Sequence, residues 1–346
     1  MISERSSQMT AESAKTAKKS AGELIKEYAG YAVNGTRYFF KNETQMWLSF
    51  LFPALILLVS YFIFGVWPFG EESVLSLDLN GQYVYYYDHM YDVLYGGESV
   101  FYSWSRNLSG EWMGIMGYYL GSPFNFIVWL FPRNAILEGL LTMMCVKVGA
   151  IGLAMSVYLS RGKGFRKLTT IIFSIVYALC AYTLVQTMNP MWLDGVMALP
   201  IICLGIEKFV DAGRFRLLVA AWVYAFVTCF YIGFMLAIFS VIYYLLYMVI
   251  TKSGTAREHF FMKSVQITGL GATAVMISAF MIIPVYESLS NGKFEFSVPD
   301  YSLKENFPLI ELLDKILPNS YDTVRMTGLP FLYCGIITVL LLPAYF

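Results

Sequence analysis

A lone carboxylate, Asp78, lies between two leucines just beyond a strongly apolar segment of the 346-residue chain. It belongs to the stretch Val74-Leu75-Ser76-Leu77-Asp78-Leu79-Asn80-Gly81-Gln82-Tyr83, which we expect at a membrane surface. A carboxylate at such a surface can take the proton of a hydroxyl group, which is the task of a general base. An ordinary solvated loop acid or a helix N-cap explains a single Asp as well, and both interpretations remain open.

Two further acids are candidates to support this one. Asp88 lies on a helix predicted over 82–94, with tyrosines on its apolar face and with Asp88 and Asp92 one turn apart on the other face. Asp194 lies in Asn189-Pro190-Met191-Trp192-Leu193-Asp194-Gly195, a turn between two predicted spans. For Asp88 an exposed helical face, and for Asp194 a turn cap, are the alternative interpretations.

Three bases are predicted to bind a phosphate group. Arg106 and Arg133 lie in the segment 68–138, which is otherwise acidic, and a guanidinium can hold a phosphate through paired hydrogen bonds. Lys147 lies inside a predicted membrane span, where a charged side chain is costly and usually functional. An ion pair with an acid explains Lys147 equally well.

The composition is that of an integral membrane protein, because 58% of the residues are hydrophobic and only 14% are charged. Soluble domains carry about 25% charged residues. The net charge of zero gives no indication of a nucleic-acid partner. We therefore expect an all-α, polytopic helical bundle in a lipid bilayer. Apolar runs predict about eight spans, at 47–67, 138–160, 168–187, 190–208, 216–232, 234–251, 264–286 and 330–346.

Basic residues are concentrated in the N-terminal tail and in every second segment between the predicted spans, at 1–46, 161–167, 208–216 and 252–263. The positive-inside rule then places the tail 1–46, with its short amphipathic stretch, in the cytoplasm. The transmembrane module is 47–346, and its loops 68–138 and 287–329 face outward. Because no basic flank follows the last span, we expect the chain to be part of a longer protein.

The order of these features resembles the GT-C superfamily of membrane glycosyltransferases. The shared features are an outer-face Asp after the first span, a long first loop with two interfacial helices, and a bundle of spans beyond it. More narrowly, the chain from about Phe39 onward resembles the bacterial YfhO family. The similar stretches are the one around Asp78, then Tyr119-Leu120-Gly121-Ser122-Pro123-Phe124-Asn125, and the turn 189–195.

This resemblance implies transfer of a sugar from an undecaprenyl-phosphate carrier to a cell-envelope polymer such as a teichoic acid, outside the bacterial cytoplasmic membrane. Asp78 then acts as the general base, and a base such as Arg or Lys holds the departing lipid phosphate. Many enzymes of the superfamily have two adjacent acids, whereas Leu77 and Leu79 flank Asp78. We therefore expect a mechanism without a metal ion or another cofactor.

Two other functions remain open. A transporter or permease usually places ionisable groups within several spans, and here only Lys147 is predicted to lie deep. A non-catalytic protein of envelope assembly would need no acid at position 78.

Overall fold

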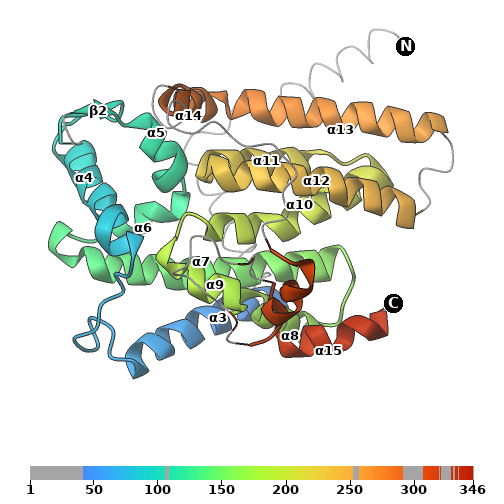
Figure 1. Cartoon of the computed structure of the whole chain (residues 1–346), viewed down its shortest axis with the longest axis horizontal. Helices are drawn as coiled ribbons and strands as arrows, with labels where there is room; N and C mark the ends of the chain where they lie inside the picture. Colours follow the sequence, from blue (N-terminus) through green and yellow to red (C-terminus); the bar gives the residue numbers. More distant parts are fainter. Residues whose placement is uncertain are drawn as a thin grey trace, which may run out of the picture.

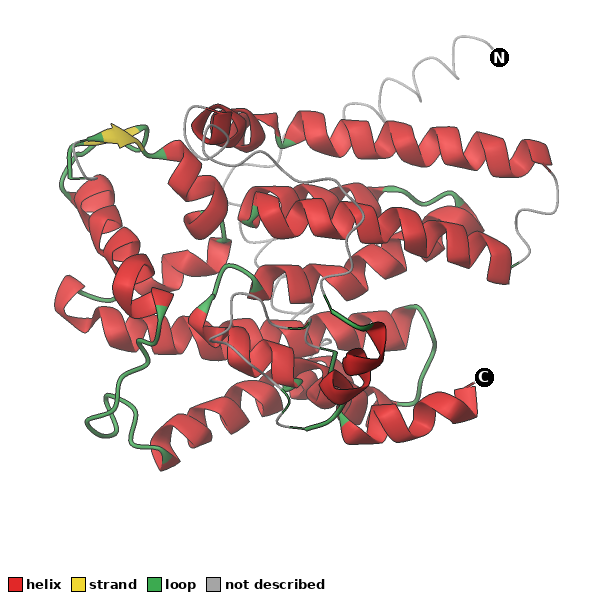
Figure 2. Ribbon diagram, in the orientation of Figure 1, coloured by secondary structure: helices red, strands yellow, loops and turns green. Residues whose placement is uncertain are grey.

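The computed structural model describes residues 42–105, 109–251, 257–290, 307–318, 320, 329, 332–333 and 335–345. Within these residues the chain is mostly helical, as the sequence predicts (Figure 1). The exception is a short antiparallel hairpin of β1 (Tyr102–Ser103) and β2 (Gly110–Glu111), drawn in yellow in Figure 2. Helices dominate because, in lipid, a spanning segment must satisfy every backbone hydrogen bond internally.

The bundle contains two groups of longer helices. In the first group, α3 (Thr44–Ile63), α7 (Ile136–Arg161) and α8 (Lys167–Ala178) contact one another. In the second group, α10 (Leu193–Ala212) packs against α11 (Arg216–Thr228) and α12 (Phe230–Ile250). Since α10 also contacts α7, the two groups form one body, as Figure 1 shows.

The remaining helices lie around this body. α13 (Arg257–Ile277) packs on α11, and α14 (Ala279–Ser290) follows it after a break at Ser278. Four helices are short, namely α5 (Met113–Ile115), α6 (Phe126–Trp129), α9 (Ala181–Val185) and α15 (Ile336–Tyr345). The helices α4 (Val84–Tyr95), α5 and α6 and the hairpin lie together at the left end of Figure 1.

A glycine on α7 allows α3 to approach closely. A Cβ atom at Gly152 would lie 2.1 Å from the carbonyl oxygen of Ser49 on α3. Small residues of this kind let helix backbones approach closely in a membrane. Close packing matters there because the hydrophobic effect does not drive helices together in lipid. We infer that this contact positions α3, and with it the segment that leads to Asp78.

The expected count of about eight spans is wrong for the described residues. Four helices there are long and apolar enough to cross a membrane: Thr44–Ile63, Arg133–Arg161, Phe230–Ile250 and Phe260–Ile277. A bent pair, Lys167–Ala178 and Ala181–Met188, turns by 44° and makes a fifth if it is one span. The structure therefore supports four to five spans.

The other predicted spans fail for separate physical reasons. The helix α11 ends at Thr228, and its 13 residues reach only about 20 Å across a hydrocarbon core of about 30 Å. Within 330–346 the only described helix is α15. The run 264–286 keeps one candidate span, in α13, and its remainder forms α14. The helix α10 is long enough but carries four ionisable residues: Asp194, Glu207, Lys208 and Asp211.

The helix predicted over 82–94 is present and slightly longer. A π-helical turn, Leu79–Tyr83, continues directly into α4. The second interfacial helix expected in the loop 68–138 is not continuous. The apolar stretch 113–129 is broken into α5, a π-helical turn over Met116–Leu120, a 3₁₀ turn over Pro123–Asn125, and α6. Glycines and a proline within this stretch disfavour one continuous helix.

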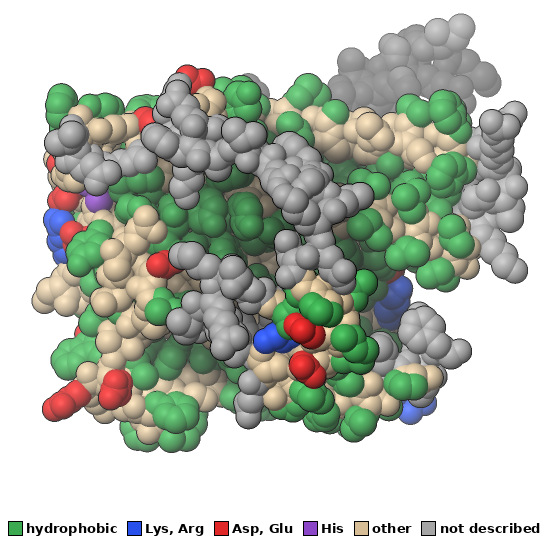
Figure 3. Space-filling model, in the orientation of Figure 1, with side chains coloured by type: hydrophobic (Ala, Val, Ile, Leu, Met, Phe, Trp, Pro, Cys, Tyr) green, Lys and Arg blue, Asp and Glu red, His purple; other side chains and the backbone are tan. Residues whose placement is uncertain are grey.

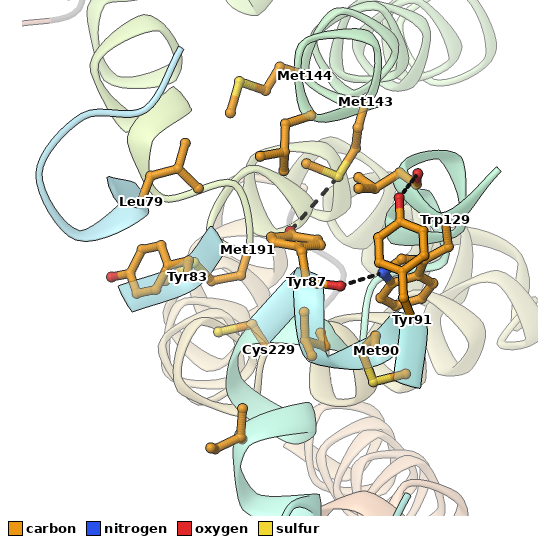
Figure 4. Close-up of a cluster of buried hydrophobic side chains, with 14 of the residues drawn as sticks. Leu79, Tyr83, Tyr87, Met90, Tyr91, Trp129, Met143, Met144, Met191 and Cys229 are labelled. Carbon is orange, nitrogen blue, oxygen red and sulfur yellow. Dashed lines mark hydrogen bonds between the residues drawn. The ribbon is translucent and has the colours of Figure 1, made fainter. Parts of the chain in front are cut away.

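A buried cluster fixes α4 against α7, as Figure 4 shows. Tyr87 of α4 is only 1% exposed and packs beside Met143 of α7. The hydroxyl group of Tyr91 donates to the carbonyl oxygens of Val128 and Phe131, at 2.9 and 3.0 Å. Tyr85, His89 and Asp92, on the opposite face of α4, line one pocket with Ser103 of the hairpin.

Hydrophobic side chains cover much of the surface seen in Figure 3. Phe62, Phe234 and Val241, on two of the candidate spans, are each at least 60% exposed. Such a surface is typical of helices that contact lipid. The predicted amphipathic stretch of the tail 1–46 and most of the loop 287–329 lie outside the described residues.

Candidate functional site

Asp78 is exposed at the start of the helix that leads through Leu79–Tyr83 into α4. Its carboxylate does not cap this helix and forms no ion pair with a described residue. The preceding residue, Leu77, has a φ of +46°, in the left-handed region that non-glycine residues rarely adopt. Such a conformation costs about 1–3 kcal/mol and is frequent at functional sites.

The hydroxyl group of Tyr83 joins Asp78 to a distant turn. Its oxygen lies 3.3 Å from Asp78 Oδ2 and 3.0 Å from Asn189 Oδ1. The side-chain nitrogen of Asn189 donates to Gln186 Oε1 at 2.7 Å, which leaves its amide oxygen for Tyr83. Burial, and next the charge of Asp78, raise the pKa of the Tyr83 hydroxyl group, so it stays protonated and donates.

Asp194 lies at the centre of a buried polar group of side chains. Its carboxylate accepts hydrogen bonds from Lys147 Nζ at 2.6 Å, from Ser122 Oγ at 2.8 Å and from the hydroxyl group of Tyr224. Lys147 Nζ also donates to the carbonyl oxygen of Pro190 at 2.8 Å. The side chains of Lys147 and Asp194 are 2% and 0% exposed. This ion pair therefore joins α7 to α10 in the interior, and the hydroxyl group of Tyr224 connects α11 to it.

The loop before Pro123 approaches α11 closely enough to deliver Ser122 to this centre. A Cβ atom at Gly121 would lie 2.1 Å from the carbonyl oxygen of Val227, so only glycine fits there without a shift. Ser122 Oγ also accepts from the backbone N–H of Phe124 at 3.3 Å and so caps the following turn. One hydroxyl group thus serves both the local turn and the buried acid.

The three stretches that carried the resemblance are brought together by these contacts. Tyr83 of the first stretch contacts Asn189 of the third, and Ser122 of the second contacts Asp194 of the third. The hydroxyl group of Tyr87 on α4 donates to Asn125 Oδ1 of the second stretch at 3.1 Å. We name Asp78, Tyr83, Asn189, Lys147, Asp194 and Ser122 the Asp78 site.

Asp88 lies outside this site. Together with Asp92 it holds Arg133, whose Nε lies 2.6 Å from Asp88 Oδ1 and whose Nη1 lies 2.6 Å from Asp92 Oδ1. These side chains are between 36% and 48% exposed. The ten residues from Asp78 to Asp88 correspond to about 15 Å of helix, so the two acids do not share one reacting atom.

The sequence predicts three bases as ligands of a phosphate group. Arg106 lies outside the described residues. The two bases that are described, Arg133 and Lys147, are both engaged with carboxylates. Among the described residues, no group of three or more His, Cys, Asp or Glu side chains is arranged to hold a metal ion.

Sequence reasoning did not identify Tyr83, Ser122 and Tyr224 as partners of the two acids. Ser122 lies in a stretch that was already singled out, so its place there was a usable signal. Tyr224 lies in an apolar helix with no neighbouring polar pattern, and nothing in the sequence marks it. A second buried acid, Glu207, was also missed; it binds Lys163 Nζ at 2.7 Å and the hydroxyl groups of Tyr158 and Tyr243.

The apolar helices and the buried charged pair define a polytopic helical membrane protein. The chain belongs to the YfhO family of bacterial membrane proteins, whose family model matches residues 49–346. No curated protein matches the chain, and no solved structure matches it.

Proposed function

We propose that this protein is a glycosyltransferase of the GT-C type, with Asp78 as its general base at the outer face of the bacterial cytoplasmic membrane. The proposal rests on which of the three candidate acids form ion pairs. Asp88 and Asp194 are both neutralised by bases. Asp78 is exposed and forms no ion pair with a described residue, so its carboxylate is free to take a proton.

The reaction needs little from the protein beyond that carboxylate and a fixed geometry. Asp78 accepts the proton of an acceptor hydroxyl group, and the hydroxyl oxygen forms a bond to the anomeric carbon of the donor sugar. The bond between that carbon and the phosphate oxygen breaks, and the polyprenyl phosphate leaves with the bonding electron pair. Tyr83 holds the carboxylate in place for this step through its hydroxyl group.

The donor in this proposal is a sugar on undecaprenyl phosphate, and the acceptor is a teichoic-acid-like polymer of the cell envelope. Membership of the YfhO family of bacterial membrane proteins supports the membrane setting of this proposal. The exposed apolar helices are consistent with a lipid-borne donor that reaches the site through the bilayer.

The bases proposed for the donor phosphate differ in how available they are. Lys147 can reach a phosphate only if its buried pair with Asp194 opens, so we propose that it mainly holds the loop at Pro190. Arg133 is half exposed, but its carboxylate partner Asp88 lies about 15 Å from Asp78 along the helix. A phosphate contact by Arg106 remains a prediction, because this residue lies outside the described residues.

The first experiment compares the sugar content of envelope polymers in cells with and without this protein. Loss of one sugar in the deletion strain, restored by the wild-type chain and not by Asp78→Asn, is the expected result. Glu71→Gln, an exposed acid earlier in the same loop, is the matched control and should restore the sugar. Unchanged sugar content in the deletion strain would refute the proposal.

An ion-coupled transporter is the second candidate, and the Lys147–Asp194 pair is the observation that favours it. Buried ionisable pairs in membrane helices often mark ion pathways. A transporter would need this pair for activity and would tolerate Asp78→Asn. The glycosyltransferase would show the reverse order of sensitivity once folding of each variant is verified.

A further inference from the structure

A polar cavity of about 620 Å³ lies between α4 and the β1–β2 hairpin, on the opposite face of α4 from its buried tyrosines. Its volume falls within the range of small-molecule sites, about 300–1,000 Å³. Its walls come from the helix that starts at Asp78, from Ser103 and Ser105 of the hairpin region, and from Arg133 at the start of the α7 span.

One wall of the cavity is aromatic. Tyr85, Tyr86 and Trp112 line it, and the rings of Tyr86 and Trp112 meet edge to face with centroids 5.8 Å apart. Tyr85 is 65% exposed, whereas Trp112 is 2% exposed. Flat aromatic faces of this kind offer apolar contact to the C–H groups of a sugar ring while leaving the ring hydroxyl groups free for polar partners.

The polar wall contains both paired and unpaired groups. Asp88 and Asp92 are fixed by Arg133, and each carboxylate retains lone pairs that can accept further hydrogen bonds. Trp112 Nε1 and His89 Nε2 are buried and have no hydrogen-bond partner among the described residues. An unpaired buried polar atom costs about 1–3 kcal/mol, which a ligand hydroxyl group could recover.

The charges select among ligand classes. Among the described lining residues, two carboxylates lie beside one guanidinium, so this part of the wall is net negative and disfavours a phosphate group. An organic cation such as a quaternary ammonium has no acceptor for the unpaired Trp112 N–H group. A neutral sugar has hydroxyl groups that both donate and accept, so it can pair with the carboxylates and with the unpaired Trp112 N–H group.

We propose that this cavity binds a neutral carbohydrate unit, with its ring on Tyr85 and Tyr86 and its hydroxyl groups on Asp88, Asp92 and His89. The cavity is distinct from the Asp78 site because no residue of that site lines it, although Gly81 and Gln82, about one helical turn beyond Asp78, do. Binding there does not depend on Asp78 being a base. If the protein is a glycosyltransferase, the cavity holds a unit of the acceptor other than the one that reacts.

The test is binding of the purified full chain to an array of neutral mono- and oligosaccharides that also carries glycerol phosphate and choline. The protein is kept in an amine-oxide detergent, because a maltoside detergent would compete as a sugar. We expect binding to at least one neutral glycan and none above background to glycerol phosphate or choline. Binding to no neutral glycan, or a preference for either charged probe, would overturn the proposal.

Variants locate the binding in this cavity. Tyr85→Ala removes an exposed ring without disturbing the core and should weaken the binding about tenfold, the equivalent of 1.4 kcal/mol. Ser105→Trp, which narrows the cavity from the hairpin side, should also weaken it. Tyr95→Ala removes a tyrosine of the same helix that is 71% exposed and is not among the cavity residues, so it should bind normally.

Asp78→Asn separates this proposal from the proposed function. It should keep the glycan binding even where it abolishes sugar transfer. If Tyr85→Ala and Ser105→Trp bound the glycan like the wild-type chain, the ligand would lie elsewhere and the cavity assignment would be wrong.

Discussion

The hydroxyl group of Tyr83 lies 3.0 Å from the amide oxygen of Asn189, a residue 106 positions further along the chain. The same hydroxyl group lies 3.3 Å from Asp78 Oδ2. Next to Asn189, the carbonyl oxygen of Pro190 accepts a hydrogen bond from Lys147, which is paired with Asp194. The exposed carboxylate and the buried ion pair are thus parts of one connected arrangement.

Tyr83→Phe should lower the rate constant of sugar transfer about fivefold and leave the KM for the donor nearly unchanged. The reason is that the variant keeps the buried ring but removes the hydroxyl group whose single hydrogen is shared between Asp78 and Asn189, and a hydrogen bond has a net value of about 1 kcal/mol. Steady-state kinetics on the purified protein give both constants. In an Asp78→Asn background the same change should have no further effect, and an additive loss would contradict a role through Asp78.

Lys147→Met should lower the free energy of unfolding by about 3–5 kcal/mol, because it leaves Asp194 as an unpaired charge in the interior. The double variant Lys147→Met with Asp194→Leu should recover much of this loss, since neither charge then remains buried. Thermal unfolding in detergent measures both. A double variant as unstable as the single one would show that the pair is not the source of the effect.

Cysteine labelling tests the predicted orientation. Ser76→Cys, next to the Asp78 site, should react with a membrane-impermeant reagent added outside intact cells, because the positive-inside rule places this loop outside. Arg166→Cys, in the basic link between α7 and α8, should react only after the cells are opened. The opposite labelling pattern would place Asp78 in the cytoplasm and exclude an outer-face reaction.

The helical class and the helix at Leu79–Tyr95 could be predicted because both depend on local pattern. Apolar length reveals membrane helices, and the spacing of Tyr83, Tyr87 and Tyr91 reveals one buried face. The number of spans could not be predicted in the same way. The breaks near Cys180 and at Cys229 depend on how each helix packs, and hydropathy averages over them.

The sequence identifies the stretches that form the candidate site, but it does not show which of their side chains contact one another. The sequence marks Asp78, Ser122 and Asp194 by their setting, but their partners come from helices that are distant along the chain. The pairing of Lys147 with Asp194, 47 positions away, was one of the alternatives for Lys147. The ion pairs of Arg133 with Asp88 and Asp92 could not be predicted from the sequence, because only tertiary packing brings the start of α7 beside α4.

The most direct test of the account is the rate at which the purified protein moves a labelled sugar from a polyprenyl phosphate to its acceptor, compared between the wild-type chain and Asp78→Asn. Asparagine keeps the shape of the side chain but cannot take a proton, so the rate should fall by about 10²–10⁴-fold while the melting temperature stays the same. Glu71→Gln should transfer at the wild-type rate. A near-normal rate for Asp78→Asn would contradict the role of Asp78 as the general base.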